Sequence, residues 1–137
     1  MHIKKEIIGF SDCDFAGVLF YGKIFDITHR ILEDYMKSND FYGDYFKDKE
    51  TVYPIIHCEA SYMKTLTAGD EIVVKLRSKT IRTSSFELEY EIFSKESEIA
   101  ALVSTIHIAI RKISKTKTEL PLKLRNLLEA LKYEKED

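Results

Sequence analysis

Two adjacent segments of the chain, 71–79 and 86–93, alternate apolar and charged residues with a period of two. Such alternation is typical of half-buried β-strands. The apolar positions would form one face of a sheet and hold Ile72, Val74, Leu76, Phe86, Leu88, Tyr90 and Ile92. The charged positions of the first segment hold Lys75, Arg77 and Lys79, and those of the second hold Glu87, Glu89 and Glu91. A turn near Arg82 and Thr83 sets these opposite charges across from one another, so the pattern predicts an antiparallel hairpin in a fixed register.

The other periodic segments complete an α+β architecture. Helical spacing of apolar residues predicts a long helix over 22–37, and a leucine-rich stretch predicts a C-terminal helix at about 120–133 with Pro121 near its first turn. Segments 2–10, 52–63 and 99–110 are expected to be strands, and 38–50 a loop with room for a helical turn. Segment 99–110 is apolar on both faces, which favours a place inside the sheet. We therefore expect one domain over 1–137, in which a curved antiparallel sheet of about five strands wraps around the long helix.

Composition restricts the classes of function. The chain has 137 residues, 45% of them hydrophobic and 32% charged, with a net charge of −2, so a role in nucleic-acid binding is disfavoured. No apolar run is long enough to cross a bilayer and the N-terminus does not read as a secretory signal, so a cytoplasmic location is expected. Cys13 and Cys58 would then be reduced thiols rather than a disulfide.

The stretch "SDCDFAGVLFYGKIF", residues 11–25, sets two acids directly before the long helix. Burying an unpaired carboxylate costs free energy, so the position of Asp12 and Asp14 before an apolar segment requires an explanation. The residues alone leave two readings of Asp14 open, a cap for the helix or turn and a catalytic carboxylate. Asp12 suits a hydrogen bond to the loop backbone. A metal site is not expected, because no further oxygen ligands follow at the spacing of a calcium loop.

The same stretch resembles the hotdog-fold thioesterases of the 4-hydroxybenzoyl-CoA thioesterase type. That family combines Asp, any residue and Asp with a nearby Gly and an apolar-aromatic run that opens the central helix. A second block, "PIIHCEASYMKTLTAGDEIVVKLR", is similar to the family's second and third strands, with the Gly-Asp turn in the expected place. The resemblance covers nearly the whole chain and implies the hotdog fold.

The resemblance also implies a set of site residues. Asp14 would be the nucleophile or the general base, and the backbone N–H of Tyr21 at the start of the helix would polarise the substrate carbonyl. Gly17 would let the chain turn closely beside the substrate. His57 would face the active site of a partner subunit, and the turn that holds Arg82 and Ser84 would lie near the phosphates of CoA.

The expected function is therefore hydrolysis of an acyl-CoA, or of an acyl-carrier-protein thioester, to the free acid and the thiol. No cofactor or metal is expected, since CoA is part of the substrate. A homodimer is expected at least, and the resemblance implies a tetramer, which would also cover the second face of the sheet. Two alternatives remain: a non-catalytic hotdog module that binds acyl groups, and a disfavoured hotdog dehydratase, which would need a suitably placed histidine.

Overall fold

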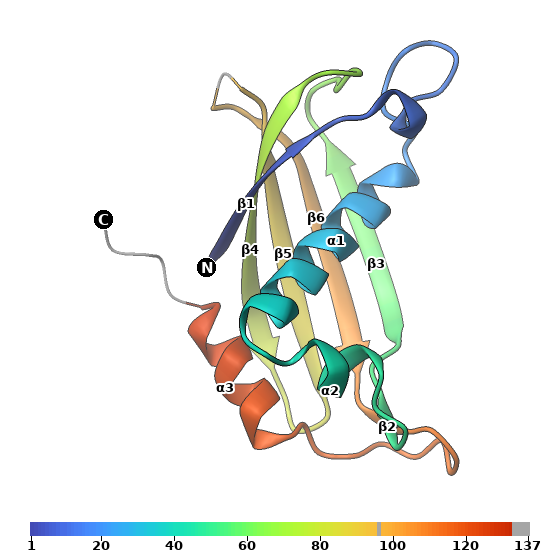
Figure 1. Cartoon of the computed structure of the whole chain (residues 1–137), viewed down its shortest axis with the longest axis vertical. Coiled ribbons are helices and arrows are strands. Elements are labelled where there is room, and N and C mark those ends of the chain that lie inside the picture. Colours follow the sequence, from blue (N-terminus) through green and yellow to red (C-terminus); the bar gives the residue numbers. More distant parts are fainter. Residues whose placement is uncertain (96, 133–137) are drawn as a thin grey trace.

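A five-stranded antiparallel sheet forms the body of the protein in the computed structural model, which describes residues 1–95 and 97–132 (Figure 1). The strands lie in the order β1-β4-β5-β6-β3. Their bounds are β1 His2–Ile7, β3 Ile55–Tyr62, β4 Glu71–Ile81, β5 Ser85–Phe93 and β6 Ile99–Ile108. The strands β4, β5 and β6 follow one another as a meander, as predicted. The edges of the sheet are β1 and β3.

The predicted hairpin of β4 and β5 is confirmed in both its pairing and its charges. Lys75 pairs with Glu91 and Arg77 with Glu89 across the two strands. The ion pairs are displaced diagonally by one step, because the long Arg77 side chain reaches Glu91 at 3.2 Å and Lys79 reaches Glu89 at 3.1 Å. The alternate residues of both strands, all seven predicted for the core, are buried.

The long helix α1, Lys23–Ser38, lies across one face of the sheet, as Figure 1 shows. It buries Ile24, Ile27, Thr28, Ile31, Leu32, Tyr35 and Met36 against the strands. This broad stripe is the amphipathic surface that the spacing predicted, and its burial is the main apolar contact that joins the helix to the sheet. The predicted loop 38–50 contains one short helix, α2, Tyr42–Phe46, whose Tyr45 is also buried.

The C-terminal helix α3, Leu122–Ala130, closes the end of the core at which α1 finishes. The Tyr35 hydroxyl on α1 donates to the carbonyl of Leu127 at 2.6 Å, and the Ser78 hydroxyl on β4 donates to that of Leu128 at 2.5 Å. Pro121 is the residue immediately before the helix, in line with its expected place. The predicted last turn, near 133, lies outside the described residues.

The strand β6 lies inside the sheet, between β5 and β3, as its two apolar faces predicted. Its inward side chains, among them Val103, Thr105 and His107, are buried beneath the helices. Two further strands, β2 Thr51–Val52 and β7 Ile110–Arg111, form a small separate pair at the end of β6. The strand β3 keeps one unpaired edge, and most of its residues are exposed in the single chain.

Candidate active site

A tight antiparallel loop carries Asp14 into the start of α1. The Asp14 N–H donates to the Val18 carbonyl at 2.9 Å, and the Phe20 N–H donates to the Asp12 carbonyl at 2.9 Å. Gly17 closes the turn with a φ of +82°, a conformation in which a side chain would be strained. The turn therefore requires a glycine at this position, while the place of Gly17 beside a substrate stays a prediction. The two hydrogen bonds hold the loop backbone on both sides of Asp14.

The two acids of the loop have different environments. The Asp12 carboxylate accepts the N–H of Gly9 at 2.9 Å, which is the expected bond to the loop backbone. Asp14 is exposed, and one of its oxygens accepts the N–H of Ala16 at 2.9 Å. That bond fixes the orientation of the Asp14 side chain, while its exposure leaves the carboxylate accessible to a substrate or a water molecule.

The start of α1 provides backbone donors beside this loop. The residue that precedes the helix is Gly22, which has no side chain to cap it. Within residues 1–95 and 97–132, the N–H groups of Tyr21 and Gly22 donate to no protein acceptor. The first amides of a helix also carry the positive end of its dipole, so this turn suits an oxyanion or another anionic group.

Two hydrogen bonds fix the direction of these donors. The Phe20 carbonyl accepts the N–H of Lys23 at 2.9 Å, which orients the planar peptide that carries the Tyr21 N–H. The Tyr62 hydroxyl, at the end of β3, donates to the Tyr21 carbonyl and so orients the next peptide. Partial burial, with a smaller effect from Tyr21, raises the pKa of Tyr62, which keeps this hydroxyl a donor. The sequence analysis missed Tyr62, and only its place at the end of a strand could have drawn attention to it.

Exposed aromatic side chains surround the loop and the helix start. Tyr21 is 70% exposed, and Phe10 and Phe15 more so. A pocket of about 300 Å³ lies against Tyr21 and Tyr62, with Val18, Leu19, Met63, Lys64, Thr65 and Leu66 as its other lining residues. Clustered exposed apolar side chains of this kind mark a surface for a ligand or a partner.

The remaining predicted site residues do not meet Asp14 within one chain. His57 lies on the exposed edge strand β3, on the sheet face away from α1, with its Nε2 3.7 Å from the Glu59 carboxylate. Arg82 and Ser84 lie in the turn between β4 and β5, near α3, at the opposite end of the sheet from Asp14 (Figure 1). The Arg82 carbonyl there accepts from the Arg125 guanidinium at 2.8 Å. These three residues can join the Asp14 site only from another subunit.

A second cluster of polar and aromatic residues lies beneath α2. His107 is buried between two hydroxyls, with Nδ1 3.2 Å from Tyr45 Oη and Nε2 2.9 Å from Thr105 Oγ1. Its ring stacks on Phe86 at 4.8 Å. Burial, and then the nearby His29, lower the pKa of His107 to about 4, so the ring is neutral near pH 7. No sequence pattern distinguishes this histidine from the other three of the chain as the buried one.

Other kinds of site are not found in the described part of the chain. Residues 1–95 and 97–132 contain no group of three or more His, Cys, Asp or Glu side chains that could hold a metal ion. Cys13 and Cys58 are both free thiols. Of the helices described, none has the length and apolar character that a membrane span requires.

The fold, with its curved antiparallel sheet around one long helix, is a hotdog domain, and the acidic loop opens directly into that helix. Residues 8–130 match the family model of the thioesterase-like superfamily. The chain belongs to that superfamily.

Two curated relatives of the chain carry the same name. The 1,4-dihydroxy-2-naphthoyl-CoA hydrolase of Trichodesmium erythraeum is 32% identical over 127 residues, which are 90% of this chain and 92% of the relative. The protein of that name from Gloeothece citriformis is also 32% identical, over 88% of this chain and 87% of the relative. The resemblance to hotdog thioesterases is therefore confirmed for the superfamily, whereas these relatives are not named 4-hydroxybenzoyl-CoA thioesterases.

Solved structures show the same fold. The crystal structure of a 1,4-dihydroxy-2-naphthoyl-CoA thioesterase from Synechocystis aligns with a TM-score of 0.88, covering 95% of this chain and 96% of that one. The sequence identity of that pair is 20%, so the match supports the fold alone.

Proposed function

We propose that the protein is a thioesterase that hydrolyses an aromatic acyl-CoA, and that 1,4-dihydroxy-2-naphthoyl-CoA is its preferred substrate. Two relatives at 32% identity over about nine tenths of the chain carry that activity in their names. The sequence analysis left the acyl group unspecified, and this proposal specifies it as a fused aromatic ring system. The exposed aromatic side chains beside the candidate site are compatible with such a flat, apolar group.

One observation carries the chemistry: an exposed, oriented Asp14 carboxylate stands in the loop that opens into a helix start with unaccepted N–H groups. In the proposed reaction the thioester carbonyl oxygen accepts the Tyr21 N–H, which stabilises the negative charge that develops there. Asp14 then either attacks the carbonyl carbon, giving an anhydride that water cleaves, or removes a proton from an attacking water. In both routes the carbon–sulfur bond breaks, CoA leaves as the thiol, and the products are the free acid and CoA.

The proposed enzyme is at least a homodimer, and two dimers would form a tetramer. The unpaired edge of β3, with Ile55 and Ile56 exposed, supports a joint between two subunits along this strand. His57 on the same strand would then face the partner subunit. Arg82 and Ser84 remain predicted CoA contacts that a neighbouring subunit would supply. The cytoplasm is the proposed location, in keeping with two free thiols.

The second candidate is a module that binds acyl-CoA, or the acyl group on a carrier protein, without cleaving it. It is favoured by one fact: the Asp14 carboxylate already has a structural partner in the Ala16 N–H, so it could be a turn cap only. The first candidate is preferred because a binder has no need of a charged group that remains exposed beside the helix start.

The test is hydrolysis by the purified protein across a panel of thioesters. The panel holds 1,4-dihydroxy-2-naphthoyl-CoA, 4-hydroxybenzoyl-CoA, a short and a long straight-chain acyl-CoA, and one acyl-carrier-protein thioester. We expect the highest kcat/KM for the naphthoyl substrate. A preference for a straight-chain substrate would overturn the aromatic assignment. Tight binding of the panel with no release of thiol would establish the binding module instead.

A further inference from the structure

A hairpin of residues 110–117, here called the basic hairpin, extends beyond the end of β6, at the opposite end of the sheet from Asp14 (Figure 1). Its backbone is closed by two hydrogen bonds. The Arg111 N–H donates to the Thr116 carbonyl at 2.9 Å, and the Lys115 N–H donates to the Arg111 carbonyl at 2.8 Å. Residues 111–117 are all exposed, and Ile113 at the tip is 94% exposed. The hairpin thus presents an apolar side chain on an ordered turn.

The charges of the basic hairpin all have one sign. Its charged residues are Arg111, Lys112, Lys115 and Lys117. In the part of the chain that the structure describes, no carboxylate oxygen lies within 4.0 Å of these cations. Lys115 closes the turn with a φ of 59°, a conformation that glycine adopts without strain, so the turn itself does not require a lysine. An exposed isoleucine among such cations suits a surface that is both apolar and acidic.

The loop that opens α1 has both of these properties. We call residues 10–21 the Asp14 loop, and their charged residues are Asp12 and Asp14. Phe10 and Phe15, in the same loop, are the two aromatic side chains that solvent reaches most fully. The basic hairpin cannot touch this loop within one chain, because the two lie at opposite ends of the sheet (Figure 1). They can meet only between two chains.

The edge strand β3 runs from one of these surfaces to the other. At its start, β2 leads into β3 and pairs with β7 at the base of the hairpin. The Lys112 N–H also donates to the Glu50 carbonyl at 2.7 Å, which ties the hairpin to the segment before β2. At the other end of β3, the Tyr62 hydroxyl donates to the Tyr21 carbonyl. The basic hairpin therefore lies near the start of β3, and the Asp14 loop near its end.

The proposed joint along β3 would bring these two ends together. A two-fold axis that joins two copies of one edge strand makes them antiparallel, because an antiparallel ladder is symmetric about such an axis. The start of β3 in one subunit then lies beside the end of β3 in the other. The basic hairpin of each subunit would therefore reach the end of the sheet at which the helix start of the partner lies.

We propose that the basic hairpin of one subunit docks on the Asp14 loop of its partner. In this contact Ile113 packs against Phe10 and Phe15 of the partner subunit, and the cations of the hairpin face the acids of the loop. The inference rests on the proposed function and names the element by which the second subunit completes each active site. Ile113 is a positioning residue, since it holds the loop that carries Asp14 and does not touch the substrate.

The activity test is Ile113→Asp, which places a carboxylate where the apolar contact is proposed. Because Ile113 is exposed in the single chain, the change should not disturb the fold of the subunit. Leu122→Asp is the matched control, since Leu122 is a 73% exposed apolar residue at the start of α3, outside the hairpin. We expect kcat/KM for the naphthoyl substrate to fall about tenfold or more in Ile113→Asp, because the loop loses its support. Leu122→Asp and the conservative Ile113→Val should retain the parent activity.

Mixed dimers show whether the hairpin acts on the other subunit. An Asp14→Asn subunit keeps an intact hairpin, and an Ile113→Asp subunit keeps an intact Asp14. A mixed dimer therefore has one complete site and one site that lacks both residues. Random exchange makes about half of the dimers mixed, so the mixture should regain about one quarter of the parent activity. A mixture no more active than the mean of the two separate variants, or an Ile113→Asp variant with parent activity, would overturn the proposal.

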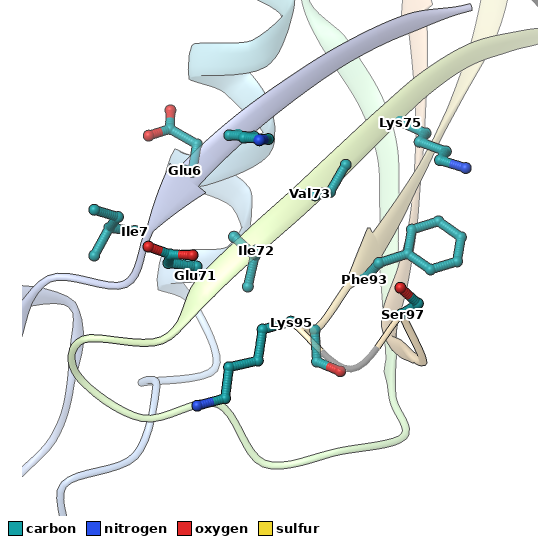
Figure 2. A pocket seen from close by; sticks show the side chains of 11 residues that line it. Glu6, Ile7, Glu71, Ile72, Val73, Lys75, Phe93, Lys95 and Ser97 are labelled. Carbon is teal, nitrogen blue, oxygen red and sulfur yellow. The ribbon is translucent and has the colours of Figure 1, made fainter. Parts of the chain in front are cut away.

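Photo-cross-linking detects the contact without any reaction. The photoreactive residue p-benzoylphenylalanine replaces Ile113, and mixed dimers of isotope-labelled and unlabelled chains show which chain is captured. We expect cross-links to residues 10–21 of the partner, with a lower yield when Lys112→Gln and Lys115→Gln are added. The matched control is Lys75→Gln with Lys95→Gln, two lysines that Figure 2 shows beside a pocket elsewhere on the sheet, and it should leave the yield unchanged.

Two results of these experiments have different meanings. Cross-links confined to the same chain, or none at all, would overturn the docking of the hairpin whatever the activity of the protein. Failure of the parent protein to hydrolyse any thioester of the panel would refute the proposed function, and the cross-links would still decide the contact.

Discussion

Replacing Asp14 by Asn separates the proposed catalytic role of this carboxylate from its capping role. In the structure one Asp14 oxygen accepts the Ala16 N–H at 2.9 Å, and Asn retains an oxygen at the same position. Asn and Asp rank together as caps, so the free energy of unfolding should change by no more than about 0.5 kcal/mol. The loop that leads to Tyr21 and the assembly of the protein should stay as they are.

The effect on catalysis should be much larger. Asn cannot act as a base and is no nucleophile toward a thioester, so kcat should fall by about two to four orders of magnitude. That loss corresponds to about 3 to 5 kcal/mol of transition-state stabilisation. KM for the CoA substrate should change little, since the nucleotide contacts are remote from Asp14.

The measurement is release of the CoA thiol followed with a chromogenic disulfide, together with thermal unfolding followed by circular dichroism. Asp12→Asn is the matched control, because that carboxylate bonds to the Gly9 N–H and has no proposed part in the reaction. If Asp14→Asn retained activity within about threefold of the parent protein, the catalytic assignment would be refuted. Equal losses in both variants would indicate damage to the loop rather than loss of a reacting group.

Three more predictions test the fold and the assembly. Burial lowers the pKa of His107 to about 4, so the ring is neutral in the folded protein near pH 7. The contribution of this histidine to the free energy of unfolding is complete above the unfolded pKa of about 6.5. It is lost as the pH falls toward 4, which lowers the free energy of unfolding by about 3 kcal/mol. His107→Gln should flatten the unfolding free energy measured from pH 8 to pH 4, and an equally steep profile would show that other groups cause it. Gly17→Ala should lower the free energy of unfolding in urea by about 1 kcal/mol, because a φ of +82° strains any residue with a side chain. No steric clash adds to this cost, since no atom lies within 4 Å of the added Cβ. No loss of stability would mean that the turn changes its conformation to accept alanine. Light scattering should give a dimer or a tetramer, and a monomer with full activity would contradict a site completed by a second subunit.

The sheet was the part of the fold that the sequence predicted best. Alternation in 71–79 and 86–93 set both the buried face and the facing charges, because a strand repeats every two residues and a slip by one would bury lysines and glutamates. The helix α1 followed from its apolar stripe in the same way. The segment 38–50 holds the short helix α2, in line with the helical turn allowed for it, but the buried bond of Tyr45 to a histidine 62 residues away could not be predicted from local pattern.

The placement of site residues depended on facts that no local pattern holds. His57 follows a register irregularity in the pairing of β3 with β6, so alternation in that segment does not indicate its side of the sheet. Arg82 and Asp14 prove to be at opposite ends because β4 runs away from the start of α1, which is a matter of topology. The placement of Asp14 in the loop directly before the helix start at Tyr21 was predictable, since the loop and the helix start are neighbours in the chain.

The hydroxyl bond from Tyr62 to the Tyr21 carbonyl links the end of the edge strand to the helix start. If two subunits join along β3, the partner orders this strand along its free edge. The end of the same strand holds the peptide beside the Tyr21 N–H, which is the proposed oxyanion donor. Specific activity would then depend on protein concentration: dilution that separates the subunits would loosen the edge strand and misalign the donor before any unfolding begins. The specific activity would fall on dilution because β3 both joins the subunits and positions the peptide at Tyr21. It would return to its full value when the protein is concentrated again.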